Sequence, residues 1–314
     1  MTASPIAIVG AGIAGLAAAR RLADAGHPVA VFDKGRGLGG RMATRRADGF
    51  VFDHGAQFFR VRGSAMGAAL SAWRDAGAAD AWFDDAFVGT PGMTAPARAL
   101  AAGLAVRTEC TVTGLSKGGS GWTLVDAAGP VAHPSNGAFA AVILAVPSPQ
   151  AIPLAASAGV AMPGLADAVY APCWALMLGF AGPLAGVKDR IEPASREIAW
   201  VARNATKPGR GEGEAIVVHA RPDWSRAQLE RDASAIPALL TVSLAGLGID
   251  IHAARYVAAH RWRYAQVETP AGSPFLHDPS GLYACGDWCI GGRVEAAFDS
   301  GHAAAGAVMA EVGR

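Results

Sequence analysis

The chain has 314 residues, a formal net charge of +1 and an apolar content of 52%. This length suits a nucleotide-binding domain with a second, smaller domain, and the balanced charge gives no basic field to attract nucleic acid. No run of about 18 apolar residues lacks polar breaks, and the apolar N-terminus lacks the basic leader of a signal peptide, so we expect no membrane partner. Four widely spread cysteines predict reduced thiols in a cytoplasmic protein and no metal site.

A dinucleotide-binding fingerprint opens the chain. The apolar strand predicted from Ile6 to Val9 runs into Gly-x-Gly-x-x-Gly at residues 10–15 and then into a helix rich in alanine and leucine. These glycines permit a tight turn, a close approach of pyrophosphate, and close packing of the helix on the strand. A second strand, Val29–Asp33, ends in a carboxylate that can accept hydrogen bonds from the adenosine ribose hydroxyls. The alternative is a structural glycine turn with a solvated Asp33.

Two segments with further cofactor character follow. Gly35–Gly40 is a glycine-rich loop closed by Arg41, so backbone N–H groups and a cation can converge on phosphate oxygens there. Phe52–Phe59 mixes small and aromatic residues, as a strand edge against a flat ring does. An ordinary buried strand is an equally good interpretation of this second segment.

The middle of the chain alternates between helical and strand patterns. Residues 63–103 are predicted to be helices and loops. Short strands at Val106–Thr108, Thr111–Leu115 and Trp122–Val125 predict a small antiparallel meander. The continuous apolar run Phe139–Val146 predicts a buried parallel strand.

Residues 150–269 have the character of an inserted α+β unit that roofs the cofactor. One helix is predicted to begin near Asp223 or Ser225 and to run towards Leu240, and residues 207–213 read as a hairpin loop. The strands predicted here are Trp174–Phe180, Ile198–Arg203, Ala215–Ala220 and Arg255–Trp262.

The end of the chain decides which dinucleotide is bound. A short apolar strand from Leu282 leads into Gly286-Asp287-Trp288 and a glycine-opened helix, and this pattern together with the front fingerprint indicates FAD rather than NAD. We expect Asp287 to bond the ribityl chain and the helix from about Val294 to aim its positive end at the flavin N1–C2=O edge. We expect the FAD to be non-covalent; attachment through Cys285 or Cys289 is the competing idea.

These elements predict an α/β fold with an FAD-binding Rossmann-like domain of the glutathione reductase type and an inserted α+β substrate domain of mixed sheet. The predicted cofactor domain comprises residues 1–62, 104–149 and 270–314. The predicted substrate domain comprises residues 63–103 and 150–269.

Four ordered segments resemble the renalase family, especially its bacterial members, within the flavin amine oxidase-like group. They are the fingerprint ending in Asp33-Lys34, the turn Gly39–Met42, the strand Gly55–Gln57, and the run Arg261–Val267. The resemblance implies an oxidase that takes hydride from 2- or 6-dihydro isomers of NAD(P), returns NAD(P)+, and passes the electrons to molecular oxygen to form hydrogen peroxide. Such chemistry needs few acid or base groups because the flavin carries the reaction.

The fingerprint, the resemblance and the C-terminal segment together give the predicted cofactor-binding residues. They are Gly10, Ala11, Gly12, Ile13, Ala14, Gly15, Asp33, Lys34, Gly40, Arg41, Met42, Gly55, Ala56, Gln57, Val112, Gly286, Asp287, Val294, Glu295 and Ala296. The simplest role of Glu295 is to complement the dipole of the last helix.

Trp288, His219 and Asn204 are the predicted substrate-orienting residues. Trp288 is placed to stack near the flavin or the substrate ring, with an ordinary core tryptophan as the alternative. His219 ends an apolar strand and Asn204 follows another, so both are candidates to bond the nicotinamide amide; a core histidine and a turn residue are the alternatives. Arg261 and Arg263 share a sheet face and bind either substrate phosphate or surface acids.

Two other functions stay open at this point. An amine oxidase or a desaturase on the same scaffold is one, although amines call for an aromatic cage and none of the four tyrosines shows the expected pairing in the sequence. A non-catalytic FAD-binding protein is the other.

Overall fold

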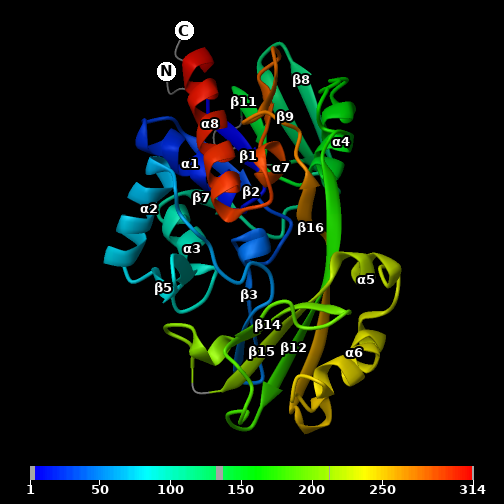
Figure 1. Cartoon of the computed structure of the whole chain (residues 1–314). Coiled ribbons are helices and arrows are strands. Elements are labelled where there is room, and N and C mark those ends of the chain that lie inside the picture. Colours follow the sequence, from blue (N-terminus) through cyan, green and yellow to red (C-terminus); the bar gives the residue numbers. More distant parts are fainter. Residues whose placement is uncertain (1–3, 132–136, 212, 313–314) are drawn as a thin grey trace.

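A six-stranded sheet forms the centre of the cofactor-binding part, in the upper half of Figure 1. The computed structural model describes residues 4–131, 137–211 and 213–312. The strand order is β17-β18-β11-β1-β2-β7, and neighbouring strands are parallel except for β17 and β18. The strands are β1 (Ile6–Val9), β2 (Val29–Phe32), β7 (Ala105–Arg107), β11 (Ala141–Leu144), β17 (Leu276–Asp278) and β18 (Leu282–Ala284). The strands predicted at both ends of the chain, and the one predicted before Val146, are therefore confirmed as members of one sheet.

Both faces of this sheet are covered, which explains why its central strands β11, β1 and β2 are apolar at every position. Ile6 and Ile8 pack in the core beneath α1 (Ile13–Asp24) and α8 (Val294–Val312). Ala7 and Val9 face the other side, because side chains alternate along a strand. A second core there includes residues of α4 (Ser148–Ser157) and of a small antiparallel meander.

The meander is confirmed, but its strands differ from those predicted. It consists of β8 (Gly114–Gly118), β9 (Gly121–Asp126) and β10 (Gly129–Pro130). The predicted strand Val106–Thr108 belongs instead to β7. This stretch follows a helix and pairs in parallel with β2, so it forms the edge of the six-stranded sheet.

Residues 63–103 contain a hairpin that the sequence pattern does not predict. Helix α2 (Ser64–Asp75) leads into β5 (Ala79–Phe83) and β6 (Ala86–Gly89), and α3 (Ala95–Ala101) follows. Buried side chains from all four elements join the core beneath α1 and α8. This segment therefore packs with the cofactor-binding part, whereas the predicted division grouped it with residues 150–269.

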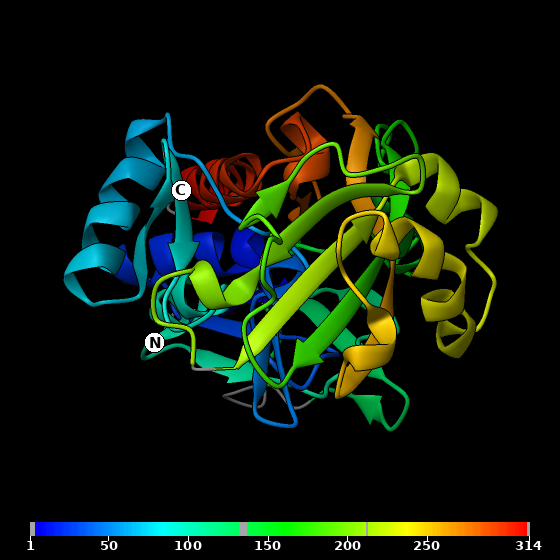
Figure 2. The ribbon, with the colours of Figure 1, turned by 60° about the horizontal axis from the view of Figure 1, so that its bottom comes forward.

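A five-stranded sheet forms the lower part of the molecule and faces the viewer in Figure 2. Its order is β13-β14-β15-β12-β16, and all its pairings are antiparallel. The strands are β12 (Val169–Phe180), β13 (Arg190–Ile191), β14 (Ile198–Arg203), β15 (Glu214–Ala220) and β16 (Tyr256–Thr269). All four strands predicted in this region are confirmed, and the 207–213 connection joins the antiparallel pair β14 and β15, as a hairpin loop does.

The predicted single helix in this region is wrong. Two helices form, α5 (Pro222–Ala227) and α6 (Ile236–Ala245), and Arg221 rather than Asp223 or Ser225 precedes the first. Pro237 lies in the first turn of α6, where proline is tolerated; inside a continuous helix its ring would break the hydrogen-bond ladder.

The five-stranded sheet is covered on both faces. Helix α6 packs on one face, in a core with Trp174 and Leu176. The opposite face receives the hairpin of β3 (Thr44–Ala47) and β4 (Phe50–Asp53), through the rings of Phe50 and Phe52. Strand β4 therefore brings the segment that follows it to the boundary between the two sheets.

Candidate cofactor and substrate site

The turn between β1 and α1 is shaped for a phosphate group. A Cβ on Gly10 would lie 2.4 Å from the carbonyl oxygen of Ala145, and one on Gly15 would lie 2.0 Å from that of Gly10. A Cβ on Gly12 would meet no described atom within 4 Å. Gly12 precedes α1, and no side chain in the described part of the chain caps this helix. The N–H groups of its first turn are therefore available to an anion.

Asp33 connects the two glycine-rich loops. Its Oδ2 accepts a hydrogen bond from the Ala11 N–H at 2.6 Å, and its Oδ1 accepts one from Gly35 at 2.7 Å. Gly39 N–H donates to the Ala11 carbonyl at 2.9 Å, so the second loop lies against the first. This geometry places Asp33 beside the phosphate turn, and its bond to the ribose stays a prediction.

Arg41 and Asp287 join the second glycine loop to the C-terminal segment. The guanidinium of Arg41, in η1 (Gly40–Met42), donates to both carboxylate oxygens of Asp287 at 2.8 and 2.6 Å, and to the Ala265 carbonyl at 3.2 Å. Asp287 begins α7 (Asp287–Ile290) and is buried. Segments predicted to bind one cofactor are therefore in contact, although here the two side chains bind each other.

Three other predicted cofactor residues also have partners within the protein. Lys34 Nζ donates to the side-chain oxygen of Gln150 at 3.1 Å. Glu295 lies in the first turn of α8, as its predicted dipole role requires, and its Oε1 also accepts the N–H of Gly63 at 2.7 Å. Val112 is buried in the second core.

The segment after β4 lies against the turn that carries Arg41. Ala56 N–H donates to the Arg41 carbonyl at 2.8 Å. A Cβ on Gly55 would lie 1.9 Å from that same oxygen, so only glycine fits. The strand predicted at Gly55–Gln57 is wrong, since β4 ends at Asp53 and residues 55–57 form a loop. This loop lies directly against the turn that carries Arg41.

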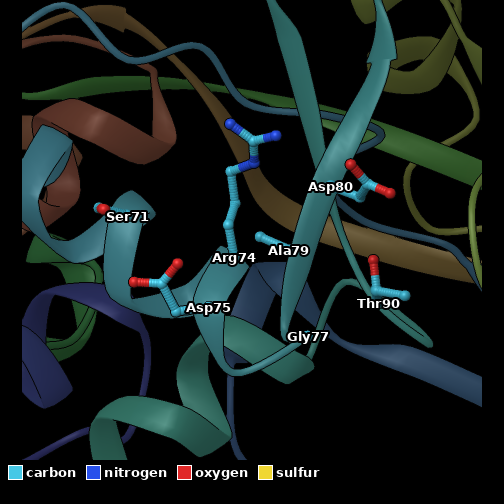
Figure 3. Close-up of a pocket in the computed structure, with 7 residues that line it drawn as sticks. All are labelled: Ser71, Arg74, Asp75, Gly77, Ala79, Asp80 and Thr90. Atoms are coloured by element: carbon cyan, nitrogen blue, oxygen red, sulfur yellow. The ribbon is translucent and has the colours of Figure 1, made fainter.

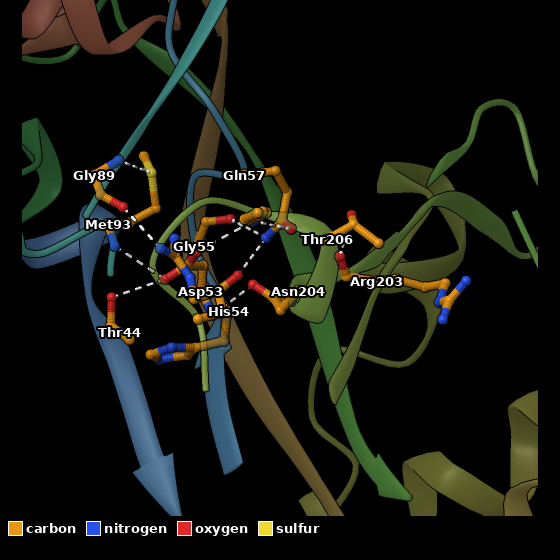
Figure 4. Close-up of polar contacts among 12 residues, drawn as sticks. Thr44, Asp53, His54, Gly55, Gln57, Gly89, Met93, Arg203, Asn204 and Thr206 are labelled. Atoms are coloured by element: carbon orange, nitrogen blue, oxygen red, sulfur yellow. Dashed lines mark hydrogen bonds and ion pairs between the residues drawn. The ribbon is translucent and has the colours of Figure 1, made fainter. Parts of the chain in front are cut away.

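A buried ion cluster follows immediately and ties this segment to the five-stranded sheet (Figure 4). Asp53 Oδ2 receives Lys207 Nζ at 3.2 Å and also the guanidinium of Arg210; Asp53 Oδ1 receives Thr44 Oγ1 at 2.8 Å and the Met93 N–H at 3.0 Å. The side chains of Asp53, Lys207 and Arg210 are 1% exposed or less.

Burial and charge oppose each other in this cluster. Burial acts to raise the pKa of Asp53, but Lys207 and Arg210 outweigh it and lower that pKa to about 2. Burial lowers the pKa of Lys207 to about 8, even though Asp53 acts to raise it. Near pH 7 the cluster therefore holds two cations and one carboxylate.

Gln57 and His219 extend the network towards the aromatic side chains. Gln57 Oε1 accepts from Lys207 Nζ at 3.2 Å, and its Nε2 donates to the Asp53 and Gly55 carbonyls. His219 Nε2 lies 3.2 Å from the His54 carbonyl oxygen and 3.4 Å from Gln57 Nε2. Burial lowers the pKa of His219 to about 4, so its ring is neutral at pH 7.

Aromatic rings border this network. The ring of His54 stacks on Trp262 at 5.1 Å, and Trp262 Nε1 donates to the His54 carbonyl at 2.9 Å. A tyrosine pair lies nearer Arg41: Tyr170 and Tyr264 meet edge to face, with ring centroids 5.5 Å apart. The sequence indicated no such pairing, because these tyrosines lie on β12 and β16 and meet only where a bulge shifts the register.

The three predicted substrate residues have different surroundings. Trp288 is fully buried in the second core, and its Nε1 donates to the Val146 carbonyl at 3.1 Å, so the core alternative describes it. Asn204 is also fully buried, in η2 (Asn204–Thr206), and its Oδ1 accepts the Asp53 N–H at 3.3 Å. Its Nδ2 has no hydrogen-bond partner among the described residues. Asn204 and His219 thus both contact the segment 53–54.

Arg261 and Arg263 form surface ion pairs, which is one of the two roles predicted for them. Both pair with Glu230, with N–O distances of 3.4 and 2.7 Å, and all three side chains are partly or largely exposed.

Asp53, Lys207 and Arg210 form the most strongly charged part of the site and are absent from the predicted one. A carboxylate within the aromatic stretch Phe50–Phe59 is the one signal that the sequence offers, because a charge in such a stretch needs a buried partner. Lys207 and Arg210 lie in a glycine-rich loop, whose composition predicts exposure to solvent.

A surface pocket of about 430 Å³ lies elsewhere, between the end of α2 and the β5–β6 hairpin (Figure 3). Arg74, Asp75 and Asp80 are among its lining residues. None of these residues belongs to the network around Asp53.

Among the described residues, no group of three His, Cys, Asp or Glu side chains is arranged to hold a metal ion. No helix in the described part of the chain combines the length and the apolar character that crossing a membrane requires.

Two family models match this chain. Residues 8–73 match the NAD(P)-binding Rossmann-like domain, and residues 67–309 match the flavin containing amine oxidoreductase family. The second match covers most of the chain.

Individual proteins give local similarity or similarity of fold. A 4,4'-diapophytoene desaturase of Staphylococcus haemolyticus is 58% identical over 56 residues, which are 18% of this chain and 11% of that enzyme. A protein from Exiguobacterium sp. 255-15, provisionally assigned as a protoporphyrinogen oxidase, superposes with a TM-score of 0.78 over 99% of this chain and 100% of its own, at 14% identity. A triple mutant of putrescine oxidase gives a TM-score of 0.72 over 98% and 99% of the two chains, at 16% identity. At these identities the structural likeness shows the fold alone.

Proposed function

The chain belongs to the family of flavin-containing amine oxidoreductases and has FAD as its cofactor; within this family, we propose that it oxidises 2- or 6-dihydro isomers of NAD(P). The products are NAD(P)+ and, after transfer of the electrons to molecular oxygen, hydrogen peroxide. The proposal combines the resemblance of four sequence segments to renalases with the chemistry of the site.

The residues present fit FAD. The open space at Gly12 and the uncapped N–H groups at the start of α1 suit its pyrophosphate. Arg41 lies two residues after Gly39, whose N–H bonds to the same turn at the Ala11 carbonyl. Asp287 would accept hydrogen bonds from the ribityl chain and would give up part of its ion pair with Arg41. When bound, FAD supplies the hydride acceptor.

The main support for the proposal is the net positive charge of the buried cluster of Asp53, Lys207 and Arg210. Lys207 and Arg210 share the single carboxylate of Asp53, and this cluster lies directly beside Gln57. An amine substrate is a cation, and a net positive charge in a poorly solvated site repels it. A dihydronicotinamide dinucleotide carries negative phosphates and is attracted.

Asn204 helps to fix this segment, because its Oδ1 accepts the Asp53 N–H at 3.3 Å. Its Nδ2 has no hydrogen-bond partner among the described residues, and the side chain is fully buried. We therefore assign Asn204 the role of holding residues 53–54 in place.

The protein's own contribution would be orientation and the exclusion of water. The charge-fixed segment 53–57 gives a rigid edge, and the rings of His54 and Trp262 supply flat surfaces next to it. A near-attack geometry, with the donor carbon and the acceptor atom roughly 3–3.5 Å apart, is sufficient for hydride transfer.

Amine oxidation is the second candidate, and the Tyr170–Tyr264 pair favours it. These two rings meet edge to face at 5.5 Å, not far from the ion pair of Arg41. The family match is compatible with this candidate, and the local desaturase match is compatible with oxidation of an apolar substrate.

Peroxide yield under oxygen separates these candidates. The purified holoprotein is mixed with putrescine, with cyclohexylamine, and with aged NADH that contains the isomers. We expect peroxide from aged NADH and none from the amines, with freshly purified NADH as the matched control. Peroxide from an amine alone would replace the proposal with the second candidate.

A further inference from the structure

His219 ends strand β15 with one ring nitrogen fixed by the protein. Its Nε2 lies 3.2 Å from the His54 carbonyl oxygen. A carbonyl oxygen accepts only, so Nε2 must carry the hydrogen. The ring is half-buried, and its Nδ1 has no hydrogen-bond partner among the described residues.

The other neighbour of this nitrogen is the Gln57 amide, at 3.4 Å, and its orientation matters. Lys207 Nζ, which can only donate, lies 3.2 Å from Gln57 Oε1. The amide nitrogen therefore faces the Asp53 and Gly55 carbonyls, which use both of its hydrogens. A flipped amide would place its oxygen against two carbonyl oxygens and its nitrogen against an ammonium group.

In this orientation the Gln57 amide does not accept the hydrogen of His219, because its nitrogen donates to two carbonyls and its oxygen is held by Lys207. The His54 carbonyl is therefore the acceptor that holds the hydrogen on Nε2. Lys207 is itself held by Asp53 at 3.2 Å and by the face of Trp82, 4.9 Å from the ring centre. The ammonium group is thus fixed on two sides before it meets Gln57.

We infer that His219 presents an unprotonated Nδ1 to the substrate, because the His54 backbone carbonyl keeps the ring hydrogen on Nε2. The inference rests on the proposed function for its substrate: a lone pair at Nδ1 accepts an N–H of a carboxamide and repels a carboxylate. The site therefore distinguishes dihydronicotinamide from dihydronicotinate, its deamidated analogue. The low pKa of His219 agrees with a neutral ring.

The tautomer is measurable without any substrate. Nitrogen-15 NMR of the holoprotein labelled at histidine separates protonated from unprotonated ring nitrogens, and the spectrum of His219→Gln identifies the signals of His219. We expect Nε2 protonated and Nδ1 unprotonated at pH 7. A proton on Nδ1 would overturn the inference whatever the enzyme oxidises.

A variant then tests whether the backbone carbonyl sets the tautomer. Gln57→Met removes the other neighbour of His219 Nε2 and is expected to leave Nε2 protonated, because the His54 carbonyl remains. Mixed His219 tautomers in a folded Gln57→Met protein would overturn the assignment to this carbonyl.

The substrate part is tested by anaerobic flavin reduction with paired 6-dihydro isomers of NAD and of its nicotinate analogue. We expect the carboxamide to react at least about tenfold faster in the wild type, and the ratio to fall towards one in His219→Phe, whose ring has no lone pair. Equal rates in the wild type would overturn the selectivity. Reduction by neither compound would instead overturn the proposed function, while the nitrogen spectra would still decide the tautomer.

Discussion

Asp53 is a buried carboxylate between two cations, so its loss leaves both of them uncompensated. We predict that Asp53→Asn lowers the free energy of unfolding by about 3–5 kcal/mol, because Lys207 and Arg210 remain buried without a counter-charge. Urea denaturation measures this change. The control is Asp85→Asn, which removes a surface pair with Arg60 and should leave the transition unchanged. Equal losses of unfolding free energy in the two variants would contradict the role assigned to Asp53.

The same carboxylate gives the stability a pH dependence. Its folded pKa of about 2 lies below the ordinary 3.8, so the folded form binds fewer protons than the unfolded form between these values. The stabilisation, on the order of 2 kcal/mol, is therefore complete above pH 3.8 and lost as the pH falls towards 2. Denaturation midpoints in this range should fall with pH in the wild type and fall less steeply in Asp53→Asn. Midpoints that fall with pH equally steeply in both proteins would show that a group other than Asp53 titrates.

At the scale of an element, the turn before α1 separates a folding role from a binding role. We predict that Gly12→Ala leaves the free energy of unfolding of the apoprotein nearly unchanged, because a Cβ there meets no described atom within 4 Å. FAD affinity should drop at least about tenfold, since the methyl group occupies the space expected for pyrophosphate. Gly15→Ala should instead destabilise the apoprotein, because its Cβ would lie 2.0 Å from Gly10. Denaturation and FAD titration measure the two effects, and unchanged FAD affinity in Gly12→Ala would place the pyrophosphate elsewhere.

Elements with a local signature were predictable from the sequence. The strand, glycine turn and helix at the front of the chain are encoded within residues 6–33, and the four strands of the five-stranded sheet follow from short apolar runs. The boundary between α5 and α6 was missed, although Pro237 marks it. The β5–β6 hairpin was missed because its turn, around Asp84, lies between aromatic residues that were interpreted as part of a loop.

The charged part of the site depends on contacts that no local pattern records. Asp53 and Lys207 are 154 residues apart and meet only because β4 packs on the five-stranded sheet. Trp288 shows the opposite case, since its position after Asp287 suggested the flavin, whereas the structure places its ring in the second core. Sequence order thus predicted which segments gather at the site, and tertiary packing decided which side chains face it.

At the level of the whole molecule, the packing of the six-stranded sheet buries the two cysteines of the C-terminal segment, Cys285 and Cys289. Burial raises the pKa of Cys289 to about 12 and that of Cys285 well above its ordinary value. Both thiols therefore stay protonated, and a thiolate is the form that attacks. We predict that the protein is yellow and that acid precipitation releases all of its FAD into the supernatant. Colour that stays in the pellet would show a covalent bond.

The proposed reaction requires C2 or C6 of a dihydronicotinamide, and not C4, to lie next to the hydride acceptor. Anaerobic stopped-flow mixing of the holoprotein with purified 2-dihydro, 6-dihydro and ordinary 4-dihydro NAD(P) tests this placement through the loss of flavin absorbance. We predict fast bleaching by a 2- or 6-dihydro isomer and none by 4-dihydro NADH on the same timescale. Fast bleaching by 4-dihydro NADH with both isomers inert would contradict this placement and make this chain a conventional pyridine-nucleotide-dependent flavoenzyme.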